Sequence, residues 1–166
     1  WSFYTMYKFN WTAEIVGYSL AVVGVLVAFV QGFLIRKIIP RLGQVKSIYL
    51  GMSFSALGLL LFGLASESWM MFAFLIPYCL GGIAGPSIQG VISSQVPANE
   101  QGELQGALTS LMSLCGVFGP LLMTNLFAFA TAKNSTFHVP GAPFFLASCL
   151  TLVSFYLSYR TLSKKH

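Results

Sequence analysis

Residues 14–35 read EIVGYSLAVVGVLVAFVQGFLI, an apolar stretch whose one charge, Glu14, stands at its first position. The hydrocarbon core of a bilayer is about 30 Å thick, and a helix needs about 20 mainly apolar residues to cross it. Four more stretches of this kind follow, so the chain is predicted to cross a membrane five times. The expected spans are approximately residues 14–35, 47–65, 69–92, 107–130 and 142–159.

The composition also indicates a membrane protein. Hydrophobic residues make up 56% of the 166 and charged residues 8%, with a mean hydropathy of +0.77. Too few polar side chains remain to cover a soluble globule. The net charge of +5 would suggest a nucleic-acid partner for a soluble domain, but in a membrane protein the topology places the basic residues. We therefore expect an all-α integral membrane protein surrounded by a lipid bilayer, with no nucleic-acid partner.

The basic residues predict the orientation of the chain. If all five spans cross, seven of the nine Lys and Arg residues lie on one side, which the positive-inside rule makes cytoplasmic. These seven are Arg36, Lys37, Arg41, Lys46, Arg160, Lys164 and Lys165, against Lys8 and Lys133 on the other side. We expect the N-terminus outside and the C-terminus in the cytoplasm. We also expect Trp1–Phe9 to be the outer end of a truncated sixth span, which would make the chain a fragment of a larger protein.

Catalytic, metal and cofactor chemistry is not indicated by the sequence. Cys79, Cys115 and Cys149 each fall inside an expected span without paired spacing, and His138 and His166 lie far apart. There is no Ser/His/Asp, paired-carboxylate or phosphate-cradling pattern. We therefore expect no enzyme, no cofactor and no metal.

Small and uncharged polar residues recur at helical spacing in three of the expected spans. The stripes are Gly17, Gly24 and Gln31 in the first span, Tyr78, Gly82, Gly85, Gln89 and Ser93 in the third, and Thr109, Ser113, Gly116 and Pro120 in the fourth. Two interpretations are open: close helix packing through small residues, or a water-filled path that needs polar groups at membrane depth. The glycines favour packing, with Gly81 and Gly85 as a GxxxG pair. Gln31 and Gln89 require either a cavity or a polar helix contact.

Two Gly-Pro pairs interrupt the third and fourth spans, Gly85-Pro86 and Gly119-Pro120. Proline removes one helical hydrogen bond and kinks the helix, which membrane helices tolerate beside neighbours or a cavity. Kinked helices of this kind could rock, as a transporter requires.

Several motifs together resemble a known family. VPANEQGELQG at 96–106, running into GVFGPLL at 116–122, resembles the C-terminal half of major facilitator superfamily drug exporters, and most closely the tetracycline-resistance branch. VGYSLA at 16–21, SESW at 66–69 and PSIQG at 86–90 match the same branch in order.

The resemblance implies a proton-coupled antiporter of a bacterial inner membrane that exports a small amphipathic molecule by alternating access. The chain would be a six-helix half bundle with five complete helices and the end of a sixth, and its partner would be the N-terminal half. The first, third and fourth spans would line the cavity, with Gln31, Tyr78, Gln89 and Ser113 facing substrate. The loop from Arg36 to Lys46, with Arg41, Gly43 and Lys46, resembles a degenerate copy of the family's cytoplasmic gating loop.

The chain also departs from the tetracycline exporters. Their histidine and aspartate in the matching helices fall at Val27 and Ser55 here, so both ionisable groups are missing. We therefore expect a different substrate, and no proton-coupling residue in this half. Glu14 is expected to be stabilised by the helix dipole and by water. A metabolite symporter of the same fold and a membrane sensor that has lost transport remain alternatives.

Overall fold

The computed structural model describes residues 1–132 and 139–162, so Lys133, His138, Lys164, Lys165 and His166 lie outside the described residues. The described residues form helices and contain no strand. The helices are α1 (Ser2–Phe9), α2 (Ala13–Phe29), α3 (Ile35–Leu42), α4 (Gln44–Leu64), α5 (Ser68–Leu80), α6 (Ala84–Ser93), α7 (Gln101–Thr131) and α8 (Ala142–Leu162). Three short segments join them: the π-helical η1 (Val30–Leu34) and the 3-10 turns η2 (Gly81–Ile83) and η3 (Ala98–Glu100).

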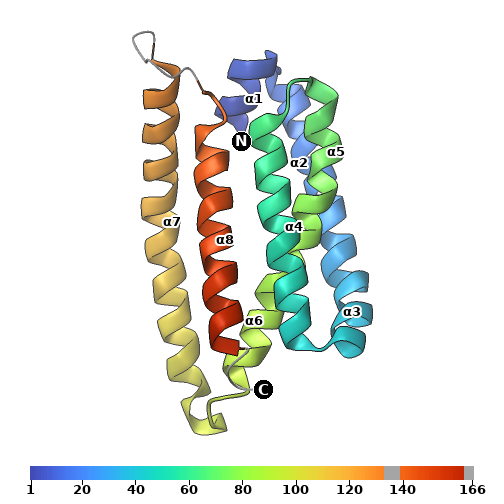
Figure 1. Cartoon of the computed structure of the whole chain (residues 1–166), viewed down its shortest axis with the longest axis vertical. Helices are drawn as coiled ribbons and strands as arrows, with labels where there is room; N and C mark the ends of the chain where they lie inside the picture. The colour runs from blue at the N-terminus through green and yellow to red at the C-terminus, as the bar shows by residue number, and fades with distance from the viewer. Residues whose placement is uncertain (133–138, 163–166) are drawn as a thin grey trace.

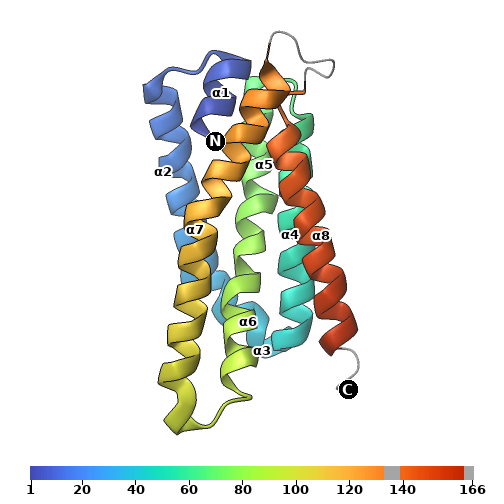
Figure 2. The ribbon, with the colours of Figure 1, turned by 90° about the vertical axis from the view of Figure 1, so that its left-hand side faces the viewer.

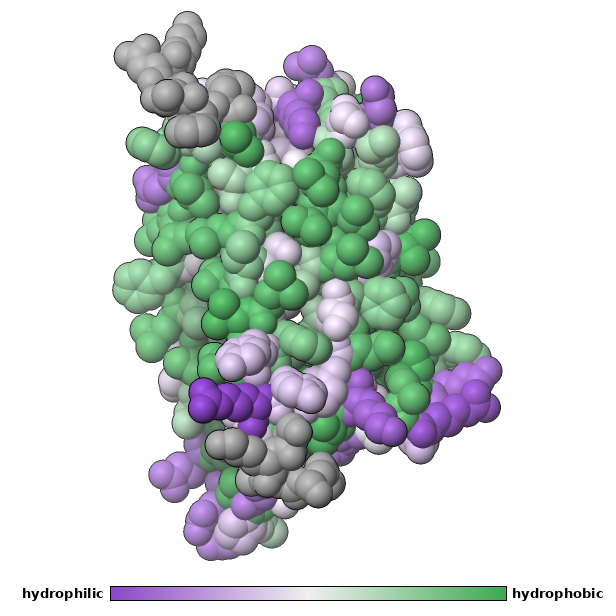
Figure 3. Space-filling model, viewed as in Figure 1, coloured by the Kyte–Doolittle hydropathy of each residue, from purple (hydrophilic) through white to green (hydrophobic). Residues whose placement is uncertain are grey.

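Five continuous helical runs are long and apolar enough to cross a membrane, which confirms the predicted number of spans. They are Ala13–Leu42, Gln44–Leu64, Ser68–Ser93, Ala98–Thr131 and Ala142–Leu162. The first and fourth runs extend beyond the expected bounds, because their polar ends continue the helix after the apolar pattern stops. The long helices stand side by side in Figure 1, and Figure 3 shows an apolar band across the molecule with polar side chains gathered toward its two ends.

Helix α4 is the centre of the bundle and packs against α5, α6 and α8. Small residues make its contacts with α5 and α6 close: a Cβ on Gly58 would lie 2.7 Å from Tyr78 Cα, and one on Gly81 would collide with Ser55. Because lipid supplies no hydrophobic drive between helices, such close backbone approach is how membrane helices gain packing energy. The Ser148 hydroxyl ties α8 to α4 by donating to the Ala56 carbonyl at 2.9 Å.

Helix α1 is held at one end of the bundle by an aromatic cluster. The Tyr4 ring packs against Phe144 with centroids 4.8 Å apart, and its hydroxyl donates to the Phe62 carbonyl at 2.8 Å. The Trp1 indole nitrogen donates to Ser19 Oγ at 3.0 Å, which joins α1 to α2. The segment predicted as the end of a span is therefore helical and packed, and its extension into a full span stays a prediction.

Helices α2 and α7 lie on opposite sides of the view in Figure 1, with α4 and α8 between them. The packed face of α2 repeats every three or four residues, at Val16, Ser19, Val23 and Leu26, and continues to Val30 in η1. Along α7, Ala130 alone is buried. Figure 2 shows α7 running past α5 and α6 as an outer helix. Both flanking helices thus leave long faces uncovered by the described residues.

Candidate functional site

The polar stripes of the sequence lie on open faces of the helices. A Cβ added to any of six glycines would meet nothing within 4 Å: Gly17, Gly24, Gly82, Gly85, Gly116 and Gly119. Packing within the described residues therefore does not explain these glycines, and the choice between close helix packing and a water-filled path stays open. Of the proposed Gly81 and Gly85 pair, Gly81 packs against Ser55 and Gly85 faces open space. Periodicity could not separate the two, because the third span carries glycine both on its packed side, at Gly81, and on its open side, at Gly85.

Gln31 lies in the π-helical segment η1, in the half of the first span that leads into α3. Its neighbour Val30 is 3% exposed and belongs to the packed face, whereas Gln31 is exposed. The amide of Ile35 bonds to the carbonyl of Val30, five residues back, in the wider π pattern. Such single π turns are frequent at functional sites. Segment η1 contacts η2 of the third span, so two departures from α-helical geometry lie side by side.

The two Gly-Pro pairs behave differently from one another. Segment η2 ends at Ile83, three residues before Pro86. The carbonyl that Pro86 cannot bond belongs to Gly82, four residues back, so the helix tightens within η2. At Gly119-Pro120 the expected interruption is wrong: α7 runs as continuous α-helix through Pro120. Gly116 stands four residues before Pro120, and its open surroundings let its carbonyl tilt aside without breaking the helix.

Gln89 is half-buried and belongs to an amide network that joins α6 to α7. Its Nε2 donates to Gln105 Oε1 at 2.7 Å. One turn earlier, Gln101 Nε2 donates to the carbonyls of Ser93 and Val96 at 2.7 and 2.8 Å, at the C-terminal end of α6. Sequence analysis missed the roles of Gln101 and Gln105. Their signal was the four-residue spacing that places both on the same face of α7 as Thr109 and Ser113.

Thr109 and Ser113 continue the line that Gln105 begins. Because Gln105 is bonded to α6, this stripe starts on the side of α7 that faces α6. The Ser113 hydroxyl donates to the Thr109 carbonyl at 2.9 Å, so its oxygen keeps its acceptor capacity. An open hollow of about 490 Å³ runs along this part of α7, lined by Thr109, Ser110, Ser113, Leu114 and Val117.

Tyr78 stands on α5 with 40% of its surface exposed. Its ring packs against Phe62 with centroids 5.4 Å apart, which fixes one side and leaves the other open. One side of the Tyr78 ring is thus packed and the other is accessible, so the ring could form part of the wall of a binding site.

The segment expected to be a basic loop is mostly helical, which corrects that prediction. Arg36 and Arg41 are exposed on α3, and Gly43 forms the single-residue break before α4. Gly43 has φ 81°, a left-handed value that favours glycine, and its amide donates to the Ile39 carbonyl at 2.8 Å. A sharp glycine corner, in place of a long loop, therefore separates the first two spans.

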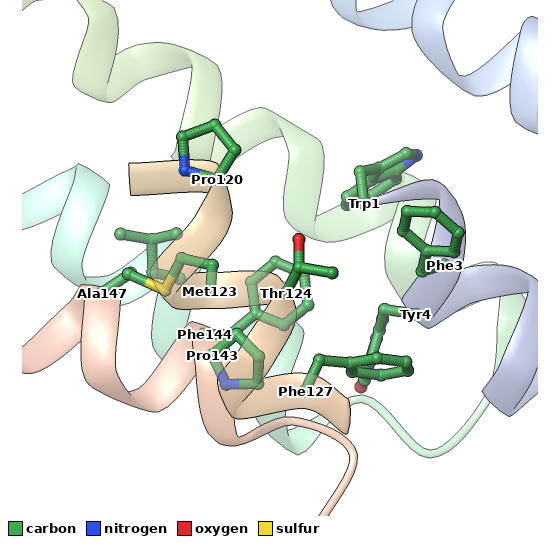
Figure 4. A pocket seen from close by; sticks show the side chains of 11 residues that line it. Trp1, Phe3, Tyr4, Pro120, Met123, Thr124, Phe127, Pro143, Phe144 and Ala147 are labelled. Atoms are coloured by element: carbon green, nitrogen blue, oxygen red, sulfur yellow. The ribbon is translucent and has the colours of Figure 1, made fainter. Parts of the chain in front are cut away.

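A pocket of about 310 Å³ opens near the aromatic cluster (Figure 4). Apolar side chains of α1, α4, α7 and α8 line it, among them Trp1, Tyr4, Pro120 and Phe144. Sequence spacing could not have revealed this pocket, because its walls come from four separate segments. Among the described residues, no group of three His, Cys, Asp or Glu could hold a metal ion.

These features define a class: a multi-pass α-helical membrane protein with polar faces left open along three of its spans. The whole chain, residues 1–166, matches the family described as Major Facilitator Superfamily. The chain belongs to this superfamily of transporters.

Several curated relatives are similar to most of the chain. The tetracycline resistance protein, class C, of Escherichia coli is 38% identical over 151 residues, covering 90% of this chain and 38% of the relative. The class G protein of Vibrio anguillarum is 36% identical over 154 residues, covering 92% and 39%. Hippocampus abundant transcript-like protein 1 of Mus musculus is 29% identical over 150 residues, covering 82% and 30%. The chain thus spans well under half the length of these relatives, and no solved structure was found to match it.

Proposed function

We propose that the chain is the C-terminal half of a proton-coupled transporter that exports a drug or another small amphipathic molecule by alternating access. The similarity to proteins named for tetracycline resistance supports an exporter. The carrying observation is the set of open polar faces on α2, on α5 with α6, and on α7. Exposing amide and hydroxyl groups to lipid is costly, so such faces call for water, substrate or another protein surface.

The partner of these faces is the N-terminal half of the same transporter. Alternating access requires one half to move against the other around a central site. The described residues bury almost none of α7. Even large apolar side chains such as Phe118 and Leu121 are 65% and 57% exposed. One wall of a cavity, with a second half opposite it, accounts for this surface.

Substrate contact is assigned to Gln31, Tyr78, Gln89 and Ser113. Gln31 offers an exposed amide within η1, and Tyr78 offers an aromatic surface. After Gln89 Nε2 has bonded to Gln105, the Gln89 carbonyl oxygen is still able to accept a hydrogen bond. Ser113 Oγ is a second acceptor. This set suits an uncharged or cationic amphipathic substrate with hydrogen-bond donors.

The gating motion is assigned to the irregular segments and to the corner at Gly43. Segments η1 and η2 touch, and the open surroundings of Gly85 and Pro86 leave α6 room to move. Gly116, Gly119 and Pro120 give α7 a point where it can bend. Arg36 and Arg41 are exposed on α3, at the end of the bundle that we propose to be cytoplasmic. The N-terminus would then lie outside, and we propose that the membrane is a bacterial inner membrane.

Transport by two halves is tested in liposomes. The chain alone should not move a fluorescent amphipathic cation under a pH gradient, and co-reconstitution with the upstream half should produce movement opposite to the proton flow. Transport by the chain alone would contradict the assignment as one half. Movement in the direction of proton flow would favour a symporter, and binding without movement would favour a sensor.

A further inference from the structure

A second pocket, of about 690 Å³, lies at the far end of the bundle from the aromatic cluster. Its walls are the end of α3, the start of α4 and the end of α8, including Gly43, Gln44, Lys46, Tyr49 and Tyr159. None of these elements contributes to the polar stripes of the transport site. The pocket therefore needs its own explanation.

The charged side chains that the structure describes around this pocket are all positive. Lys46 lines the pocket, while Arg41 and Arg160 each lie next in sequence to a lining residue. All three are exposed, and no ion pair is found for them among the residues that the structure describes. The four acids of the chain, Glu14, Glu67, Glu100 and Glu103, stand on other segments: the start of α2, the turn before α5, and the η3 and α7 start.

Positive charge around the pocket favours an anion, and a backbone feature and a hydroxyl group favour one as well. Gly43 provides no side-chain cap for α4, so the first amides of the helix lack a side-chain partner. The Tyr49 hydroxyl is buried without a hydrogen-bond partner, the only such side-chain atom among the described residues. An anionic oxygen beside Tyr49 would accept from this hydroxyl and relieve the cost of leaving it unpaired.

The position of the pocket indicates that the anion comes from a lipid headgroup. Tyr49 and Tyr159 pack with ring centroids 5.6 Å apart where the apolar runs of α4 and α8 end, which is the level of the lipid headgroups. Basic pockets between membrane helices at this level bind anionic headgroups. We propose that this pocket is a site for the phosphate group of an anionic phospholipid, with Lys46 as its central cation.

The test uses the full chain in detergent, offered equal amounts of phosphatidylglycerol and phosphatidylcholine with the same acyl chains. Native mass spectrometry should show preferential retention of phosphatidylglycerol. Lys46→Gln should lower that retention about fivefold, the effect of one basic residue near a membrane surface. Lys37→Gln is the matched control: it removes the same charge from α3, where the ammonium lies over Phe33 and not in the pocket.

Circular dichroism checks that each variant keeps its helices, and Lys46→Arg should restore the retention. Equal retention of the two lipids by the unmodified chain would overturn the proposal. So would equal losses in Lys46→Gln and Lys37→Gln, which would indicate a diffuse basic surface. Displacement of phosphatidylglycerol by free glycerol phosphate would assign the site to a soluble phosphate compound instead. The test does not involve transport, so its outcome is independent of the proposed function.

Discussion

The hydrogen bond between Gln89 and Gln105 determines which donors and acceptors of each side-chain amide remain available to a ligand. Gln89 has used a donor and keeps its carbonyl oxygen, while Gln105 has used an acceptor site and keeps its NH₂ group. Both side chains are half-buried, so each keeps part of its surface accessible. The pair can thus be a helix contact and a ligand site at once.

Replacing Gln89 separates these two roles. Gln89→Leu should change substrate range or raise KM, because it removes an acceptor from the site, while costing about 1 kcal/mol of stability for one interhelical hydrogen bond. The measurements are transport kinetics in the complete transporter and thermal unfolding. Gln105→Leu is the control, since it breaks the same hydrogen bond and leaves the Gln89 amide in place. Equal effects of both variants on stability, with unchanged transport, would show that the pair only joins helices.

Glu14 stands at the first position of the apolar stretch 14–35, and we predict that it takes no part in proton coupling. It lies exposed in the first turn of α2, where the helix dipole favours a carboxylate, and it accepts a hydrogen bond from the Tyr18 hydroxyl at 3.3 Å. Glu14→Gln should leave the pH dependence of transport unchanged. Tyr18→Phe, which removes the same hydrogen bond but keeps the charge, is the control. A shift in the pH profile with Glu14→Gln alone would place a coupling site in this half.

At the scale of the elements, the close contact between α4 and the third span requires glycine where the two backbones approach, as at Gly81. Gly81→Val should destabilise the protein by about 1–3 kcal/mol through overpacking, because its Cβ would collide with Ser55. Gly85→Val, four residues further along the same stretch, meets open space and should cost less. Thermal unfolding of both variants in the same detergent measures the difference. A larger loss at Gly85 would contradict the arrangement of these helices.

The five spans could be predicted from sequence because apolar length alone determines a membrane helix. The bounds were less predictable: α3 carries Arg36 and Arg41 yet continues the first helix, since backbone hydrogen bonding does not stop where apolarity stops. The irregular segment at η2 was expected near Pro86 and lies just before it. The π segment η1 was missed, because no single residue type marks it.

The site was predictable only in part for a similar reason. Periodicity identified Gln89 and Ser113 as members of stripes, but it could not distinguish an open face from a packed one. Gln105 was missed because its partner lies across a turn between two helices. The apolar pocket and the basic pocket each combine side chains from at least three helices, and contacts of that kind appear only when the chain is folded.

At the scale of the whole molecule, the bundle has a packed centre on α4 and open polar stripes on α2, on α5 with α6, and on α7. The central claim is that the polar stripe of α7 borders an aqueous path in the complete transporter. Ser113 and Leu111 are close in depth but lie on nearly opposite sides of the helix. Leu111 should face lipid, so the two positions form a matched pair.

The most direct test measures how fast a charged, water-soluble thiol reagent reacts with Ser113→Cys and with Leu111→Cys. The background replaces Cys79, Cys115 and Cys149 by alanine, and the complete transporter is kept in its membrane. Ser113→Cys should react at least about tenfold faster, because a thiolate and a charged reagent both require water, and substrate should slow the reaction. Equal rates at the two positions, or faster reaction at Leu111→Cys, would contradict the account.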